Sequence, residues 1–151
     1  MAPRDDKLTL VVRKVFRASA EFLFDAWTDP KRMAAWFHAQ ADWTTEVVEA
    51  DLRVGGAWKI VMHGAEGPTC LALGQYVEID RPRRLAFTWQ PNGEGDYETL
   101  VTLSFRVIGP DSTELVLTQS GFREEKDRTE HQHGWDGCLT SLTRLVDARS
   151  S

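Results

Sequence analysis

The spacing of apolar residues changes several times along the chain, and each spacing predicts one kind of element. The segment from Leu8 to Phe16 is rich in β-branched and apolar side chains, a composition typical of a strand. Ser19 then offers a helix N-cap, and apolar residues follow at helical spacing at Leu23, Ala26 and Trp27. The chain is therefore expected to begin with a strand and a short helix.

A second short helix is predicted directly after the first. Asp29 offers another cap, and Pro30 suits the first helical position because its missing N–H would have no partner there. Trp36 and Phe37 follow Met33 at the spacing of neighbours on one helix face. This face is expected to pack on the rest of the protein.

Between residues 44 and 119 the apolar pattern alternates with a period of two. Clusters of turn-forming residues interrupt the alternation and divide the region into six strands joined in a meander. Successive side chains of a strand point to opposite faces, so one face of the antiparallel sheet is apolar and needs a cover. The residues expected on that face include Trp58, Ile60, Met62, Leu85, Phe87, Trp89, Val101, Leu103, Phe105 and Val107.

The C-terminal region is expected to supply this cover. Asp127 and Glu130 have the spacing of a capping box, with Asp in place of Ser or Thr. An amphipathic helix of about five turns should follow. Its apolar stripe comprises Trp135, Cys138, Leu139, Leu142, Leu145 and Val146.

The order of elements, β-α-α-β(6)-α, predicts an α+β fold. We expect a single domain over residues 1–151, with an ordered core at about residues 7–147. A chain of this length buries enough surface to hold a core and a pocket. Its six tryptophans and seven phenylalanines suit either dense packing or a cavity for an apolar guest.

Charge and composition narrow the classes of function. A formal net charge of −5 and a pI near 5.4 argue against nucleic acid, which requires clustered basic residues. No apolar run approaches the roughly 18 residues of a membrane span, and the N-terminal MAPRDDK lacks the apolar core of a signal peptide. The two cysteines, Cys70 and Cys138, lie within apolar patterns and suit a reducing compartment. We therefore expect a cytoplasmic protein without a membrane span.

The stretch from Glu130 to Val146 contains His131, His133 and Cys138, which raises the question of a metal site. Helix residues two apart point about 200° away from each other, and residues seven apart lie about 10.5 Å apart along the axis. Zinc ligands lie only about 2.0 to 2.3 Å from their ion, so these three cannot share one. We expect neither a metal nor a cofactor.

His131 is the one candidate for catalysis, because it lies four residues before Trp135 and shares its inward face. Such a histidine is either a structural group or a polar anchor in an apolar pocket. No G-x-S-x-G nucleophile motif occurs, and apolar burial would make Cys138 unreactive by raising the pKa of its thiol. Glu78 interrupts an apolar run and is expected to face solvent.

Four stretches, taken in order, resemble one protein family. They are FRASAEFLFDAWTDPKRMAAWF at 16–37, DLRVGGAWKIVMHG at 51–64, GQYVEIDRPRRLAFTW at 74–89 and HQHGWDGCLTSL at 131–142. The chain resembles the SRPBCC superfamily, also called START-like or birch-pollen-allergen-like. Within it, the resemblance is to the family named for the activator of heat-shock protein 90 ATPase, C-terminal-domain type.

Two motifs of that family can be placed residue by residue. Its H-x-x-G-W element matches His131, Gly134 and Trp135. Its G-G-x-aromatic motif matches Gly55, Gly56 and Trp58. The resemblance implies a helix-grip fold, in which a curved antiparallel sheet wraps the long C-terminal helix around an internal cavity. It implies no particular reaction, because one fold hosts many functions.

Three functions are consistent with this reading. The first is binding of a small apolar or aromatic molecule, without catalysis. The second is a cyclase-like or hydrolase-like enzyme with His131 as general acid or base. The third, implied by the family name, is a cochaperone-like domain that stimulates a chaperone ATPase. Binding is preferred, because no second inward polar group is evident for catalysis.

The predicted ligand contacts come from the presumed inner faces of the sheet and the C-terminal helix. The predicted ligand-binding residues are Trp58, Met62, Trp89, Phe105, His131, Trp135 and Leu139.

A homodimer is a further expectation if Trp36 or Trp43 forms an exposed patch, although isolated exposed aromatic residues are also ordinary.

Overall fold

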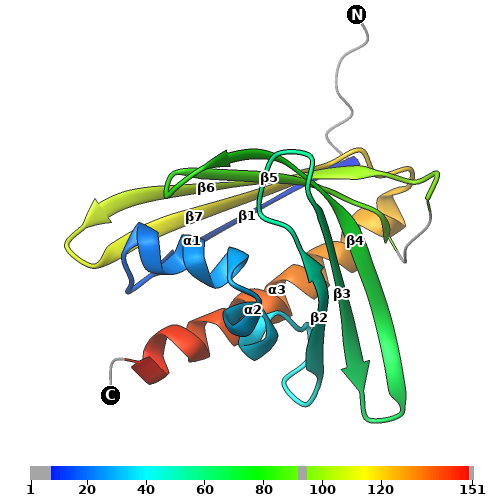
Figure 1. Cartoon of the computed structure of the whole chain (residues 1–151), viewed down its shortest axis with the longest axis horizontal. Helices are drawn as coiled ribbons and strands as arrows, with labels where there is room; N and C mark the ends of the chain where they lie inside the picture. Colours follow the sequence, from blue (N-terminus) through cyan, green and yellow to red (C-terminus); the bar gives the residue numbers. More distant parts are fainter. Residues whose placement is uncertain (1–7, 92–94, 150–151) are drawn as a thin grey trace, which may run out of the picture.

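The computed structural model describes residues 8–91 and 95–149, so the N-terminal segment and residue 7 of the expected core lie outside the described part. The α+β order of elements is confirmed (Figure 1). In chain order the elements are β1 (Thr9–Phe16), α1 (Ala20–Thr28), α2 (Pro30–Trp36), β2 (Thr44–Ala50), β3 (Ala57–Gly64), β4 (Gly67–Asp80), β5 (Arg84–Trp89), β6 (Thr99–Gly109), β7 (Ser112–Ser120) and α3 (Glu125–Arg149).

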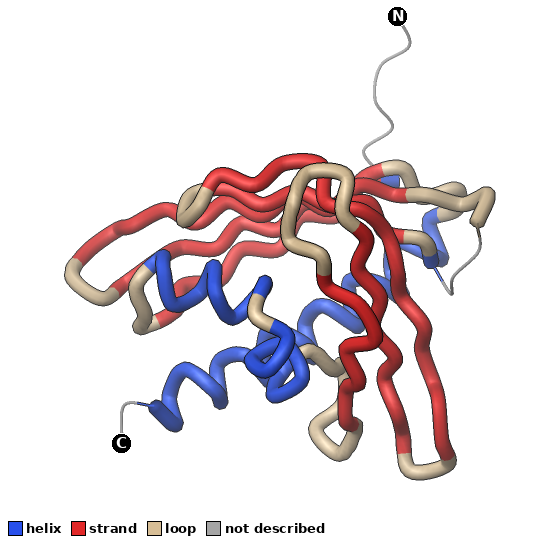
Figure 2. Tube along the Cα trace, viewed as in Figure 1, coloured by secondary structure: helices blue, strands red, loops and turns tan. Residues whose placement is uncertain are grey.

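The strands form one antiparallel sheet in the order β1-β7-β6-β5-β4-β3-β2. The sheet bends sharply, so that β2 and β3 run down one side while β1, β6 and β7 lie across the top (Figures 1 and 2). Helix α3 crosses the concave side, and α1 and α2 lie beside it. The expected helix-grip fold is therefore confirmed. No helix in the described part of the chain is long and apolar enough to cross a bilayer.

The bend of the sheet is located on β4, which pairs with β3 and with β5. Gly74 permits a close approach there, because a Cβ at this position would lie 1.9 Å from the carbonyl oxygen of Thr88. The indole N–H of Trp58 donates to the same oxygen at 3.2 Å. A register shift between Tyr76 and Glu78 follows directly, and such irregularities increase local twist.

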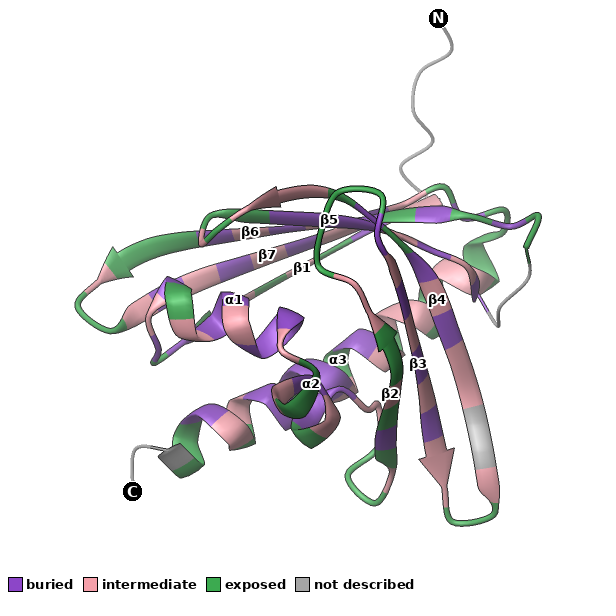
Figure 3. Cartoon of the chain, in the orientation of Figure 1, coloured by how far each residue is buried: buried purple, intermediate pink, exposed green. Residues whose placement is uncertain are grey.

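The predicted inward face of the sheet is buried, with one exception (Figure 3). Val107 was expected to point inward but is 65% exposed. The ladder between β5 and β6 ends at Ser104, so the part of β6 that carries Val107 has no β5 residue beside it. The period-two pattern correctly predicted the strand, but it does not show where a neighbouring strand stops.

The two short helices start where their capping residues predicted. The Ser19 hydroxyl accepts the N–H of Phe22 at 3.1 Å, and the Asp29 carboxylate accepts the N–H of Lys31 at 3.1 Å. Trp36 lies on the packing face, as its spacing predicted, because its side chain is fully buried and its indole N–H donates to the carbonyl of Ala26 at 2.8 Å. Trp36 therefore cannot contribute to a dimer surface.

Helix α3 starts earlier and is longer than predicted. Its 25 residues make about seven turns rather than five, beginning at Glu125 instead of just after Asp127. The Asp127 carboxylate does not act as the N-cap but accepts the hydroxyl of Tyr97 at 2.8 Å. The side chain that the sequence pattern predicted as the N-cap therefore makes a tertiary contact with Tyr97 instead.

The middle of α3 touches the loop between α2 and β2 at Gly137. A Cβ on Gly137 would lie 2.0 Å from the carbonyl oxygen of Ala39, closer than any real contact. At Gly134, one turn earlier, a Cβ would meet nothing within 4 Å. Only Gly137 is therefore required by packing.

This difference predicts opposite effects of the same substitution. Gly137→Ala should lower the free energy of unfolding by about 1–3 kcal/mol, because the loop backbone has to move. Gly134→Ala should raise it by about 0.5–1 kcal/mol, because alanine favours the helical backbone. Urea unfolding of the two variants provides the test. Equal stability of Gly137→Ala and the wild type would contradict the close approach.

Candidate functional site

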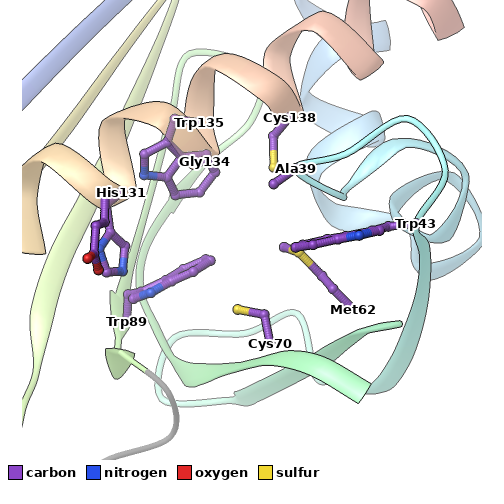
Figure 4. A pocket seen from close by; sticks show the side chains of 10 residues that line it. Ala39, Trp43, Met62, Cys70, Trp89, His131, Gly134, Trp135 and Cys138 are labelled. Atoms are coloured by element: carbon purple, nitrogen blue, oxygen red, sulfur yellow. The ribbon is translucent and has the colours of Figure 1, made fainter. Parts of the chain in front are cut away.

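A cavity of about 210 Å³ lies between α3, the loop joining α2 to β2, and the bent part of the sheet (Figure 4). It opens to solvent at one side. Tryptophan rings and sulfur-bearing side chains form most of its wall, so the interior is mainly apolar. The lining residues are Ala39, Trp43, Met62, Cys70, Trp89, Glu130, His131, Gly134, Trp135 and Cys138.

Four of the seven predicted ligand contacts line this cavity, namely Met62, Trp89, His131 and Trp135. The other three, Trp58, Phe105 and Leu139, are buried in the core instead. Trp58 packs against Trp89 with ring centroids 5.3 Å apart, so it supports the wall without being part of it.

Several lining residues were not anticipated from the sequence. Trp43 was considered only as an exposed dimer residue, but it is half-buried and lines the cavity from the loop between α2 and β2. Cys70 and Cys138 were interpreted as packing residues only. Cys138 lies three residues after Trp135, a spacing that could have placed it on the same wall. Trp43 carried no such signal, because loop residues follow no period.

The Trp135 ring is fixed by a buried chain of hydrogen bonds. Its indole N–H donates to the side-chain oxygen of Gln119 at 2.7 Å, and the Gln119 amide donates to the Thr99 hydroxyl at 2.9 Å. That hydroxyl donates in turn to the backbone oxygen of Trp89 at 2.9 Å. The three side chains are at most 3% exposed. The chain therefore connects two cavity-lining residues, Trp135 on α3 and Trp89 on β5, through the core.

Aromatic rings pack behind this chain and hold the wall in place. Trp135 lies 5.1 Å from Trp89, 5.7 Å from Phe37 and 5.8 Å from Trp27, measured between ring centroids. Trp27 also packs edge-on to Trp36 at 4.7 Å. Such ring pairs contribute about 0.5–1.5 kcal/mol beyond the area that they bury. The wall is therefore formed before any guest enters.

His131 is oriented by its neighbours on two sides. Its Nδ1 lies 2.8 Å from the carbonyl oxygen of Asp127, and because a carbonyl can only accept, Nδ1 carries the proton. The ring packs against Phe122 at 5.0 Å and edge-on to Trp89 at 6.3 Å. In the neutral ring Nε2 is therefore a hydrogen-bond acceptor. His133, two residues later, is exposed.

The two cysteine thiols keep the inner part of the cavity uncharged. Burial raises the pKa of Cys70, and burial followed by the nearby Cys70 raises that of Cys138. Both therefore remain thiols at neutral pH, which makes them poor nucleophiles. The carboxylate of the lining, Glu130, is sequence-adjacent to His131 and was predicted from the sequence only as part of a capping box. Glu78 lies elsewhere, half-exposed and paired with Arg84 at 3.2 Å.

The loop that carries Ala39 and Trp43 is held by His38. The hydroxyl of Thr45 on β2 lies 3.4 Å from Nδ1 of His38, and that of Ser141 on α3 lies 3.3 Å from Nε2. Desolvation, and next the charge of Arg144, lower the pKa of His38. A neutral His38 thus bridges the strand and the helix on either side of the cavity wall.

Comparison with known proteins identifies the family. The family model of the Activator of Hsp90 ATPase homolog 1-like proteins matches residues 17–147. The chain belongs to this family. The expected membership of the Activator of Hsp90 ATPase homolog 1-like family is thereby confirmed. No curated protein matches the sequence significantly.

Solved structures share the fold over almost the whole chain. A protein from Chromobacterium violaceum is 26% identical, with a TM-score of 0.81 over 91% of this chain and 96% of its own. A protein from Rhodobacter sphaeroides is 27% identical, with a TM-score of 0.78 over 97% of this chain and 96% of its own. An HSP90 activator from Plasmodium falciparum is 20% identical, with a TM-score of 0.74 over 93% of this chain and 96% of its own. At that identity the last match shows only the fold.

Within the described residues, no group of three or more His, Cys, Asp or Glu side chains is placed to hold a metal ion. The cavity therefore offers aromatic faces, sulfur atoms and one imidazole acceptor beside a carboxylate. This arrangement suits recognition of an apolar or aromatic guest by shape, with a few polar groups to orient it.

The buried hydrogen-bond chain predicts a strong effect at Gln119. Gln119→Leu should lower the free energy of unfolding by about 1–3 kcal/mol, because it leaves the Trp135 N–H buried without an acceptor. Denaturant unfolding measures the loss. The matched control is Gln75→Leu, the same change at an exposed position of β4, which should stay within about 0.5 kcal/mol of the wild type. Similar losses in both variants would contradict a role for the chain.

The lowered pKa of His38 predicts a pH-dependent stability. As pH falls below the ordinary value of 6.5, the unfolded state takes up the proton before the folded state does. The contribution of neutral His38 is therefore complete above that pH and decreases as the pH falls towards the lowered pKa. Unfolding free energies measured across this range should fall less steeply for His38→Gln than for the wild type. His133→Gln, at an exposed position, is the control, and a wild-type slope in both variants would contradict the prediction.

Proposed function

We propose that this protein binds a small aromatic or apolar molecule in the cavity beneath the bent sheet. The observation that carries the proposal is the cavity wall itself. Three tryptophans, Trp43, Trp89 and Trp135, lie around one open space that is continuous with solvent (Figure 4). A dense core would leave no such space, since protein interiors pack like organic crystals.

The physical character of the wall supports a planar or polarizable guest. Tryptophan faces attract other aromatic rings in stacked or edge-on arrangements, and Met62 adapts its shape at low cost. The hydrogen bond from Trp135 to Gln119 and the packing of Phe37 hold the Trp135 ring in place. A preformed wall reduces the loss of conformational entropy on binding.

A hydrolase-like or cyclase-like activity is supported less well. His131 supplies an acceptor and Glu130 supplies a second polar group at the same wall, but no hydrogen bond between their side chains is found. The inner thiols, Cys70 and Cys138, remain protonated and do not provide a nucleophile. These groups suit orientation of a guest better than a proton-transfer sequence.

Stimulation of a chaperone ATPase is the alternative function that the family description suggests. It rests on the matched family and on the shared fold of the Plasmodium falciparum HSP90 activator. It concerns an outer surface and does not explain the internal cavity. A coupled chaperone ATPase assay with the purified protein would separate the two functions, because a binding protein should leave the ATPase rate unchanged.

The binding function is tested by filling the cavity. In NMR titrations with propylnaphthalene, a neutral aromatic probe, the indole N–H signals of Trp89 and Trp135 should shift in a saturable way. Gly134→Leu should weaken this binding more than about tenfold, because the new side chain occupies space that is open at Gly134. Thr140→Leu, an exposed position of the same helix, should bind as the wild type does.

Two results would count against the proposal. The first is the absence of saturable shifts in the wild type at the solubility limit of the probe. The second is equal affinity of Gly134→Leu and the wild type, which would place the probe elsewhere. Urea unfolding of both leucine variants distinguishes a filled cavity from a misfolded protein.

A further inference from the structure

A second cavity of about 250 Å³ adjoins the aromatic one. Glu130 and His131 line both cavities, so the two share a wall on the first turns of α3. The aromatic cavity is mainly apolar. The second cavity, which we call the polar cavity, is lined in addition by Pro91, Tyr97, Arg123, Glu124 and Asp127.

Negative charge prevails in the polar cavity. Among the described residues, its lining includes three carboxylates, Glu124, Asp127 and Glu130, and one guanidinium, Arg123. The guanidinium donates to the backbone oxygen of Asp96 and lies 3.7 Å from the carboxylate of that residue, in a largely exposed pair. The lining carboxylates outnumber this guanidinium, and their excess negative charge favours a cation.

The internal bonds of the polar cavity keep it in shape without neutralising it. Tyr97 donates its hydroxyl to Asp127 and accepts the backbone N–H of Arg123 at 2.9 Å, while the Arg123 guanidinium lies over the Tyr97 ring. Glu130 has a cationic partner in Lys126, but at 3.9 Å and with both side chains largely exposed. Exposed ion pairs of this kind contribute little, so a ligand cation can replace the lysine.

His131 lines both cavities, and it also favours a cationic ligand. Its Nδ1 proton is donated to the Asp127 carbonyl, so Nε2 offers a lone pair to a donor. An ammonium group has several N–H donors and no acceptor, and so satisfies both the imidazole and the carboxylates. A ligand carboxylate would meet like charges and an acceptor.

From this juxtaposition we propose that the natural ligand is a cationic amphiphile, with an aromatic or apolar body in the aromatic cavity and a protonated amine in the polar cavity. The inference rests on the proposed binding function and adds the class of ligand to it. Glu130 and His131 connect the two parts, so a linker of only a few atoms between ring and amine suffices. The polar cavity acts as the selectivity element, and the aromatic cavity provides most of the affinity.

Three probes that share one aromatic body test the proposal. They are naphthylethylamine, the uncharged propylnaphthalene and the anionic naphthylpropanoate, each titrated by NMR at neutral pH and low salt. The amine should bind at least about fivefold more tightly than the neutral probe, and the anion more weakly than either. The decisive readout is the ratio of dissociation constants for the amine and the neutral probe.

Matched charge variants locate the source of this ratio. Glu130→Gln should reduce the ratio about threefold, and Glu124→Gln combined with it should bring the ratio close to one. Glu125→Gln removes the same charge from the same helix, but Glu125 lines neither cavity and pairs with Arg128. This control should keep the wild-type ratio.

The outcomes distinguish the class of ligand from the binding function itself. Saturable binding of all three probes with equal affinity, or preference for the anion, would overturn the cationic ligand and leave the binding function standing. An unchanged ratio in the double variant would likewise overturn it. Failure of every probe to bind would overturn the binding function and the ligand class together. A ratio that decreases only in the Glu124 and Glu130 variants would support the proposal.

Discussion

The hydrogen bond between the Trp135 indole and Gln119 is the contact on which the rest of the structure depends. It joins the C-terminal helix to the end of β7, and Thr99 extends it to the backbone of β5. In an apolar interior an unmade hydrogen bond is costly, so these polar groups permit only one register of helix against sheet. Ring packing alone would tolerate several registers, because it has little directional preference.

The fixed helix in turn makes the cavity possible. Gly74 lets β4 approach β5 closely, and β2 and β3 run away from the strands across which α3 lies (Figure 1). The loop between α2 and β2 closes part of the gap by touching α3 at Gly137 and bonding to it through His38. Trp135 and the backbone at Trp89, which border the remaining space, are fixed by hydrogen bonds with the core behind them.

Much of this could be predicted from the sequence, because periodicity and capping are local. Ser19 and Asp29 marked both short helices, and alternation identified the inward residues of the strands. Two features depend on long-range geometry and could not be predicted from the sequence. One is that β5 ends before it reaches Val107, and the other is which tryptophans line the cavity and which pack behind its wall. Trp58 and Trp89 look alike in the pattern, yet only Trp89 reaches the cavity.

The cavity walls lie on two kinds of backbone, and the two should tolerate substitutions differently during evolution. The wall on α3 and β5 is tied to the buried hydrogen-bond chain, so substitutions there affect folding. The wall formed by Ala39 and Trp43 lies on a loop between α2 and β2, outside the sheet ladder. Substitutions in this loop can alter the size and chemistry of the opening while the scaffold stays intact. Ligand preference can therefore diverge through a few loop residues, faster than the fold itself.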